Sequence, residues 1–108
     1  MLPDNEIAPE ELKARLDLHE PIVLLDVRQD WETKLCRLEN AVHIPIEEIE
    51  YRTEELNPED EIVVYCHVGQ RSAAVAHYLT QLGFKNAKNL IGGLDYWAQT
   101  VDPAMRRY

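Results

Sequence analysis

The sequence predicts an α/β fold built on a mainly parallel sheet. Two short apolar runs, at 22–25 and 62–65, are typical of strands that are covered on both faces. Between 72 and 82, apolar residues recur instead at helical spacing. Strands and helices therefore alternate along the chain, and this order joins neighbouring strands in parallel through helices.

The residues before the first strand predict a helix. It opens at 8–11, where proline suits the first turn and two glutamates complement the positive end of the helix dipole, and it ends at 19–21. The buried strand at 22–25 follows. The weaker elements after it are a short helix with Trp31 and Leu35 one turn apart, a strand at 41–44, a helical turn around Ile46 and Ile49, and a turn at 57–60.

The helix at 72–82 is the clearest element of the second half. Ser72 can cap its start and Gly83 ends it. Its expected buried side is formed by Val75, Tyr78, Leu79 and Leu82.

Two elements are expected after this helix. A strand at 87–91 leads through Gly92 and Gly93 to a last helix near Tyr96 and Trp97. The tail at 101–108 shows no periodicity, so we expect it to be loosely held.

The length of 108 residues allows one domain, with its core at about 7–100 and the tail after it. Hydrophobic residues make up 45% and charged residues 29%, as in ordinary globular proteins. No apolar run approaches the roughly 20 residues that cross a bilayer, and residues 1–6 do not resemble a secretory signal. The default expectation is a cytoplasmic protein.

The net charge of −9 argues against nucleic acid or a membrane as a general partner, because both need clustered lysine and arginine. The acids are concentrated at 47–61, where only Arg52 is basic. One interpretation is a solvated face that maintains solubility. The alternative is a docking surface for a basic protein.

The two cysteines, Cys36 and Cys66, are too few for a disulfide framework and are expected to be free thiols in a reducing compartment. Neither they nor the four histidines show the spacing of zinc ligands, so we expect no metal and no cofactor.

Three segments follow strands at the edge where parallel sheets bind ligands, at 26–28, 66–71 and 92–93. The loop at 66–71 carries the only cysteine among them. Because it joins a strand directly to a helix, it must curl tightly, and Gly69 supplies the backbone freedom for this.

A curled loop turns its backbone N–H groups inward and forms a nest for an anion, to which the following helix adds its positive end. Arg71 can add a full charge. Together these groups favour Cys66 as a thiolate, which is the nucleophilic form. The alternatives are a merely buried cysteine, an Arg71 paired with a surface acid and a solvated His67.

Three segments resemble the signatures of the rhodanese family, from about residue 7 to Trp97. They are Leu-Leu-Asp-Val-Arg at 24–28, Tyr-Cys-His-Val-Gly-Gln-Arg-Ser at 65–72, and Leu-Ile-Gly-Gly at 90–93 followed by Trp97. The resemblance implies a rhodanese-like fold, with a mainly parallel five-stranded sheet and helices on both faces.

The resemblance also implies a sulfurtransferase in which Cys66 carries a transferable sulfur as a persulfide. The donor would be thiosulfate or a persulfide, and the acceptor cyanide, a thiol or a protein. The active loop would then be formed by His67, Val68, Gly69, Gln70, Arg71 and Ser72, with Asp26 and Arg28 organising it.

Two rival functions remain open at this point. One is a non-catalytic module that keeps the fold for protein binding. The other is phosphatase or arsenate-reductase-like chemistry, which the spacing disfavours: Cys66 to Arg71 is C-x4-R, whereas related phosphatases use the longer C-x5-R. We expect a monomer, and the negative charge favours a protein or low-molecular-weight persulfide as donor over a small anion.

The segment at 36–41 departs from the family pattern and keeps only its final alanine. Cys36 occupies the position of the usual first glycine. It either packs as a small hydrophobe or acts as a second thiol toward Cys66, which requires the two Cα atoms to lie closer than about 7 Å.

Overall fold

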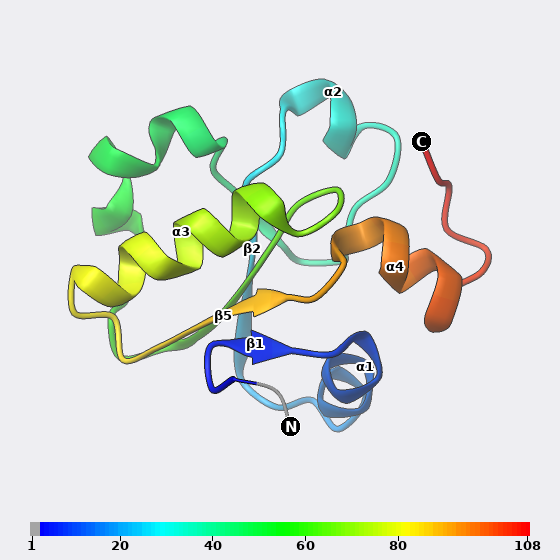
Figure 1. The fold of residues 1–108 in the computed structure, drawn as a ribbon, viewed down its shortest axis with the longest axis horizontal. Coiled ribbons are helices and arrows are strands. Elements are labelled where there is room, and N and C mark those ends of the chain that lie inside the picture. Colours follow the sequence, from blue (N-terminus) through cyan, green and yellow to red (C-terminus); the bar gives the residue numbers. More distant parts are fainter. Residues whose placement is uncertain (1–2) are drawn as a thin grey trace.

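A single sheet of five parallel strands forms the centre of the protein (Figure 1). The structure is a computed structural model and describes residues 3–108. The strands are β1 (Glu6–Ile7), β2 (Ile22–Asp26), β3 (Val42–His43), β4 (Glu61–Tyr65) and β5 (Asn86–Leu90). Their order across the sheet is β1-β5-β4-β2-β3, which places β4 in the middle.

Helices cover both faces of this sheet, which confirms the predicted fold class. The α-helices are α1 (Pro9–Asp17), α2 (Asp30–Thr33), α3 (Gln70–Gln81) and α4 (Gly93–Thr100), and the 3-10 helices are η1 (Ile46–Tyr51) and η2 (Thr53–Glu55). In Figure 1, α3 and the 3-10 helices lie on one side of the sheet, and α1 and α4 lie on the other.

The apolar runs correspond to buried strands, because each strand contributes side chains to two hydrophobic cores, one on each face of the sheet. Along β4, Ile62 and Val64 point toward α3, whereas Val63 and Tyr65 point toward α1 and α4. All four side chains are fully buried. A strand with no solvent-facing side needs an unbroken run of apolar residues, and this is what the sequence provides.

The elements differ most clearly from the sequence expectations in three places. β1 was not recognised in the residues themselves, because two residues are too few for a period-two pattern. α3 begins at Gln70 rather than at Ser72, because the left-handed Gly69 (φ 101°) starts the helix two residues earlier. Leu82 follows the end of α3 and is 50% exposed, so it does not belong to the buried side.

The tail is held against the domain, so the expectation of a loose tail was wrong. Val101 and Met105 pack against the core beside Trp97, and Arg107 forms an ion pair with Asp95 at 2.9 Å. Irregular backbone removed the periodic signal without removing these contacts. Within residues 3–108, none of the helices combines the length and the apolar character needed to span a membrane.

Glu61 links three elements at the start of β4. It accepts hydrogen bonds from Arg15 of α1 and from Lys88 of β5, at 2.6 and 3.0 Å. The Arg15 hydrogen bonds outweigh the opposing effect of burial and, with Lys88, lower the pKa of Glu61 from 4.5 to about 2. A lowered pKa in the folded state stabilises the fold above the unfolded value, and this contribution disappears as the pH falls toward 2.

We therefore expect Glu61→Gln to reduce the free energy of unfolding by about 1–2 kcal/mol near neutral pH, and by much less at about pH 3. Urea unfolding at the two pH values measures this difference. Glu39→Gln, at an exposed position outside the helices and strands, is the matched control and should change little at either pH. An equal loss at both pH values for Glu61→Gln would show that the ion pair does not contribute.

Candidate active site

Cys66 follows the last residue of the central strand, at the edge where β2, β4 and β5 all end. Its residue surface is only 1% exposed. The structure brings the three predicted segments together at this edge: Val27 donates its N–H to Tyr65, and Leu94 donates to Cys66. The three segments therefore lie side by side, as the sequence predicts for the ends of parallel strands.

The loop from Cys66 to Gly69 turns back on the sulfur atom. The backbone N–H of Gly69 donates to Cys66 Sγ at 3.1 Å, and that of Ser72 donates at 3.4 Å. The left-handed conformation of Gly69 permits this reversal without the steric penalty of a Cβ atom. Two amides, one from the loop and one from the first turn of α3, thus point at the same sulfur.

The start of α4 holds the other side of the loop. Leu94 and Asp95 donate their N–H groups to the carbonyl oxygens of Cys66 and His67, at 2.9 and 3.0 Å. A Cβ atom on Gly93 would lie 2.5 Å from both oxygens, so only glycine allows the approach. Because the carbonyls are turned toward α4, the amides of the loop are left to face the site.

Four more backbone N–H groups of this region have no protein acceptor within residues 3–108. They belong to His67, Val68, Gln70 and Arg71. Val68 is 51% exposed, so the loop is open to solvent on its outer side. Unpaired amides on a curled loop at a helix start form an anion-binding nest.

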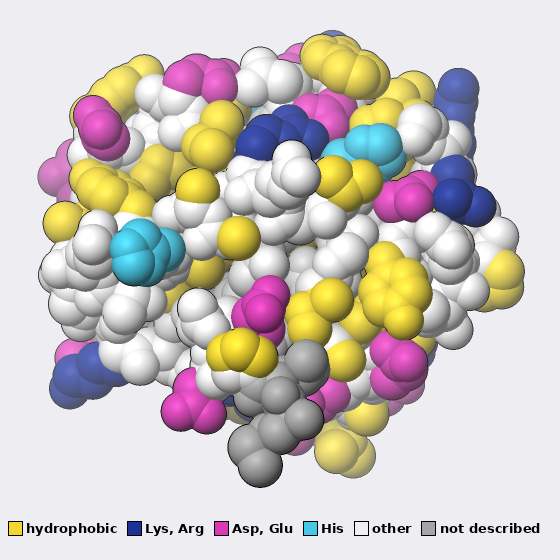
Figure 2. All heavy atoms as spheres, viewed as in Figure 1, with side chains coloured by type: hydrophobic (Ala, Val, Ile, Leu, Met, Phe, Trp, Pro, Cys, Tyr) yellow, Lys and Arg dark blue, Asp and Glu magenta, His cyan; other side chains and the backbone are white. Residues whose placement is uncertain are grey.

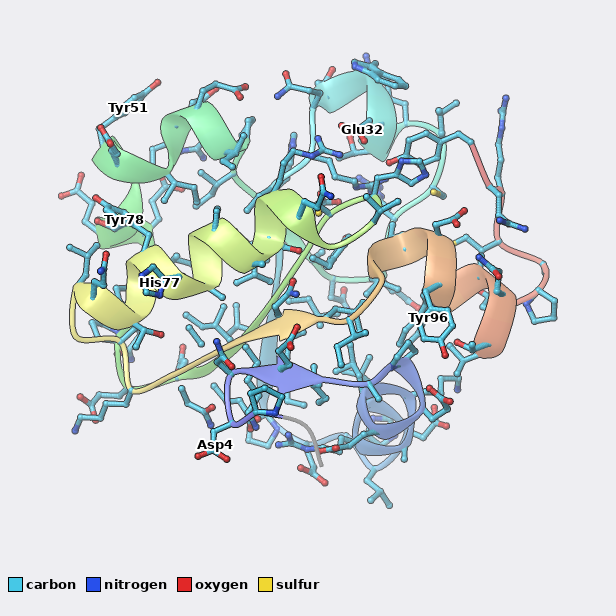
Figure 3. All side chains as sticks on the ribbon, in the orientation of Figure 1. Asp4, Glu32, Tyr51, His77, Tyr78 and Tyr96 are labelled. Atoms are coloured by element: carbon cyan, nitrogen blue, oxygen red, sulfur yellow. The ribbon has the colours of Figure 1, made fainter. Side chains whose placement is uncertain are left out.

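Arg71 makes no hydrogen bond to Cys66 Sγ, and its side chain is paired with an acidic residue. Its guanidinium forms two hydrogen bonds to Glu32, at 2.7 and 2.9 Å. Glu32 projects from α2 toward the loop (Figure 3), and its side chain is 4% exposed. Hydrogen bonding from Arg71 outweighs burial and lowers the pKa of Glu32 to about 2, so the pair carries no net charge.

Asp26 and Arg28 form a second buried ion pair beneath the loop. Arg28 donates to both oxygens of Asp26, at 3.0 and 2.7 Å, and also to the carbonyls of Glu32 and Cys36. Burial lowers the pKa of Arg28, because it disfavours the charged guanidinium. The hydrogen bonds to Asp26 and Tyr108 outweigh burial, so the pKa is raised overall. The pair therefore fixes the path of the chain around α2, and the structure places neither side chain against Cys66 Sγ.

Tyr108 covers the loop from the tail. Its ring stacks on His67 with 4.0 Å between centroids, and its hydroxyl donates to Glu32 at 2.6 Å and accepts from Arg28 at 3.1 Å. His67 Nε2 is buried and has no hydrogen-bond partner within the described chain. In the upper part of Figure 2, basic, acidic and histidine side chains lie next to one another on the surface.

Ser72 is not a helix cap, because it lies inside the first turn of α3. Its hydroxyl is 3.2 Å from Cys66 Sγ and donates to Asn89 Oδ1 at 2.5 Å. Asn89 in turn donates to Glu6 at 3.2 Å. Sequence reasoning included Ser72 in the loop but missed its link to β5 and β1.

Three residues of the site had no place in the sequence analysis, namely Glu32, Asn89 and Tyr108. Asn89 left a signal, because it is a polar residue inside the strand predicted at 87–91 and a buried polar group needs a hydrogen-bond partner. The link of Glu32 to Arg71 and the link of Tyr108 to Glu32 left none, since these partners are 39 and 76 residues apart.

The structure does not bring the two thiols together. Cys36 is half-buried, accepts a long N–H contact of 3.8 Å from Arg28, and packs in the core beside α1 and α4. Cys66 packs in the core on the α3 side of the sheet. Both are free cysteines, and no three metal-ligating side chains cluster within residues 3–108.

Comparisons with known proteins agree on one family. A family model described as Rhodanese-like domain matches residues 8–100. A protein of Allochromatium vinosum named sulfurtransferase is 35% identical over 95 residues, covering 88% of this chain and 89% of its own. YrkF of Bacillus subtilis is 39% identical over 92 residues, and the chain spans only half of its length. The crystal structure of a rhodanese-like domain protein from Staphylococcus aureus superposes with a TM-score of 0.83 at 32% identity, covering 96% and 98% of the two chains.

The contact at Gly93 gives a direct test of how the loop is held. We expect Gly93→Ala to destabilise the fold by about 3 kcal/mol or more, because its Cβ would collide with backbone oxygens that cannot move independently. The matched control is Gly83→Ala, which has a similarly positive φ of 99° but nothing within 4 Å of the added atom. It should lose only about 1 kcal/mol. Urea unfolding measures both, and equal losses would show that backbone strain alone decides the outcome.

Proposed function

Because this chain belongs to the family of rhodanese-like domains, we propose that it is a sulfurtransferase in which Cys66 carries the transferred sulfur as a persulfide. The observation that carries the proposal is the position of Cys66 Sγ, at the base of a loop whose amides point inward. Such preorganised donors stabilise negative charge where it develops during a reaction. Sulfurtransferase names among its full-length relatives support the same activity.

The first half of the proposed cycle loads the cysteine. The Cys66 thiolate attacks the terminal sulfur of the donor, and a new S–S bond forms while the bond between that sulfur and the rest of the donor breaks. The electron pair leaves with the donor fragment, which is sulfite when the donor is thiosulfate. The negative charge moves to the outer sulfur of the persulfide, where the free amides of the loop can hold it.

The second half of the proposed cycle transfers the outer sulfur from Cys66 to an acceptor. An acceptor nucleophile, such as cyanide or a thiolate, attacks the outer sulfur, and Cys66 Sγ leaves as a thiolate. The N–H groups of Gly69 and Ser72 already point at Sγ, so they can stabilise the charge that returns to it. Two displacements at one cysteine require no cofactor, and we propose none.

Two features favour sulfur over phosphate at this loop. The first is that Sγ is almost fully buried, so a donor must bring its reacting atom into the loop, and a terminal sulfur is a single atom. The second is that Glu32 occupies the end-on fork of Arg71 through both of its terminal nitrogens, so that fork is already engaged and does not face the oxygens of a phosphoryl group. Both features count against the phosphatase alternative.

The charge of the protein bears on the donor. The net charge is −9, and both arginines near the site are neutralised by buried carboxylates. Long-range attraction of a small dianion such as thiosulfate is therefore absent. We propose a low-molecular-weight or protein-bound persulfide as the cellular donor, a thiol or protein as acceptor, and a monomer in a reducing compartment such as the cytoplasm as the working state.

Intact mass spectrometry after incubation with thiosulfate tests the activity. We expect the mass to increase by one sulfur atom, the increase to disappear on treatment with cyanide, and Cys66→Ser to show no increase. The matched control is Cys36→Ser, which should still take up sulfur because Cys36 packs in the other core.

Other outcomes would favour the rival functions. A chain that takes up no sulfur from thiosulfate or from a glutathione persulfide, but hydrolyses an aryl phosphate, would be a phosphatase. An unreactive Cys66 in a folded chain would instead favour the non-catalytic binding module.

A further inference from the structure

A chain of hydrogen bonds runs from the reactive cysteine to the edge strand β1. Cys66 Sγ lies 3.2 Å from Ser72 Oγ, Ser72 Oγ lies 2.5 Å from Asn89 Oδ1, and Asn89 Nδ2 lies 3.2 Å from Glu6 Oε2. Cys66, Ser72 and Asn89 are buried, whereas Glu6 is partly exposed. The paired register of Glu6 with Asn89 places both side chains on the α3 side of the sheet.

The direction of this chain follows from counting hydrogens. The ionised carboxylate of Glu6 can only accept, so Asn89 must turn its NH₂ group toward Glu6 and its carbonyl oxygen toward Ser72. That oxygen also only accepts. Ser72 has a single hydroxyl hydrogen, and the 2.5 Å contact commits it to Asn89. Ser72 is then left with only lone pairs to offer Cys66, and these suit a thiol S–H.

We propose that Asn89, oriented by Glu6, is a positioning residue that sets Ser72 as an acceptor toward Cys66 and so favours the resting thiol over the thiolate. The proposal rests on the function proposed above for its consequence in catalysis. Asn89 itself does not touch the reacting sulfur; it acts through the hydroxyl of Ser72.

The thiolate is the one state of the cycle that this arrangement leaves short of a hydrogen bond. If Ser72 turns its hydrogen to a thiolate, two bare oxygens face each other at 2.5 Å. If it does not, a lone pair faces the charged sulfur. The persulfide avoids this conflict, because its inner sulfur carries neither a proton nor a full charge.

The consequence is a thiolate that is more reactive and a loaded state that is relatively more stable. A thiolate with fewer hydrogen bonds is a stronger nucleophile and a poorer leaving group. The chain of hydrogen bonds therefore reduces the ionised fraction of the resting thiol, and it slows the departure of Cys66 Sγ when an acceptor attacks, which holds the sulfur in the loaded state.

Other charged or titratable groups surround Cys66 and are left unchanged by the tests below. They are Arg71 with Glu32 from α2, His67 with Tyr108 stacked on it, Asp95 at the start of α4, and the Asp26–Arg28 pair after β2. Any shift produced by Asn89 or Glu6 must therefore be measured against this constant background.

The protonation state of Cys66 can be followed by NMR through the β-carbon shift of isotope-labelled cysteine, in a Cys36→Ser background where Cys66 is the only cysteine. We expect Asn89→Ala to lower the pH midpoint of this titration by about one unit, because Ser72 becomes free to donate to the thiolate. Asn89→Asp, which keeps an acceptor beside Ser72 and adds a negative charge, should raise it.

Glu6→Gln provides a milder variant at the partly exposed end of the chain. The amide of Gln can donate as well as accept, so Asn89 can turn round, donate to Ser72 and release the hydroxyl hydrogen toward the sulfur. We expect a lower midpoint here too, without the cavity that Asn89→Ala leaves. This variant tests the proposal even if Asn89→Ala does not fold.

A Ser72→Ala background separates this route from simple charge effects. In this background, Asn89→Ala and Glu6→Gln should no longer shift the pH midpoint of the Cys66 titration. Unchanged midpoints in the Ser72-containing variants, or shifts that persist without Ser72, would overturn the proposal. The titration requires no sulfur donor, so its result is independent of the sulfur-uptake experiment, and either proposal can fail alone.

Discussion

The chemistry of the site depends on one backbone contact, between the loop after β4 and the first residues of α4. Leu94 and Asp95 bind the carbonyl oxygens of Cys66 and His67, and Gly93 lets the two backbones meet. The starts of two helices thus have different roles. The N–H groups at the start of α4 turn the carbonyls of the loop away from the site. At the start of α3, the backbone N–H of Ser72 donates to the sulfur of Cys66. An anion nest needs its carbonyls held outward as much as its amides inward, because an unpaired carbonyl would repel the same anion.

The site provides for a negative charge without a free cation. Arg28 and Arg71 both lie close to the loop, yet each is matched by a buried carboxylate, Asp26 or Glu32. A guanidinium left unpaired in this surrounding would be costly to bury, and the carboxylates remove that cost while fixing the side chains in place. What remains for a ligand is the set of backbone amides. Since amides cannot be titrated, the charge that the loop stabilises depends little on pH through the loop itself and mainly on the sulfur.

The sequence was informative wherever a structural requirement is local. Unbroken apolar runs predicted β2 and β4 because both faces of these strands are covered, and Gly69 after Cys66 predicted a tightly curled loop. It was uninformative where the partner is distant. Glu32 neutralises Arg71 from 39 residues away, and no spacing pattern records such a pair. Ser72 was assigned to a cap because serine commonly caps helices, whereas a left-handed Gly69 already begins α3. The tail was judged by periodicity, which reports regular backbone and not the packing of single side chains such as Tyr108.

The size of the loop follows from the same contacts and explains why its length should discriminate between substrates. The loop is fixed at one end by β4, at the other by α3, and along its back by α4. A Cβ on Gly69 would already lie 3.2 Å from the backbone nitrogen of Gly92, so the loop has no room to withdraw toward α4. It can therefore widen only by giving up the hydrogen bonds to Leu94 and Asp95. Those bonds direct the amides inward, so a wider loop would also hold an anion less strongly.

A loop of this kind can admit a larger group only if a residue is added, because its existing residues cannot be stretched further. The four residues between Cys66 and Arg71 thus set the size of the loop, and the proposed transfer of a single sulfur atom is consistent with that size.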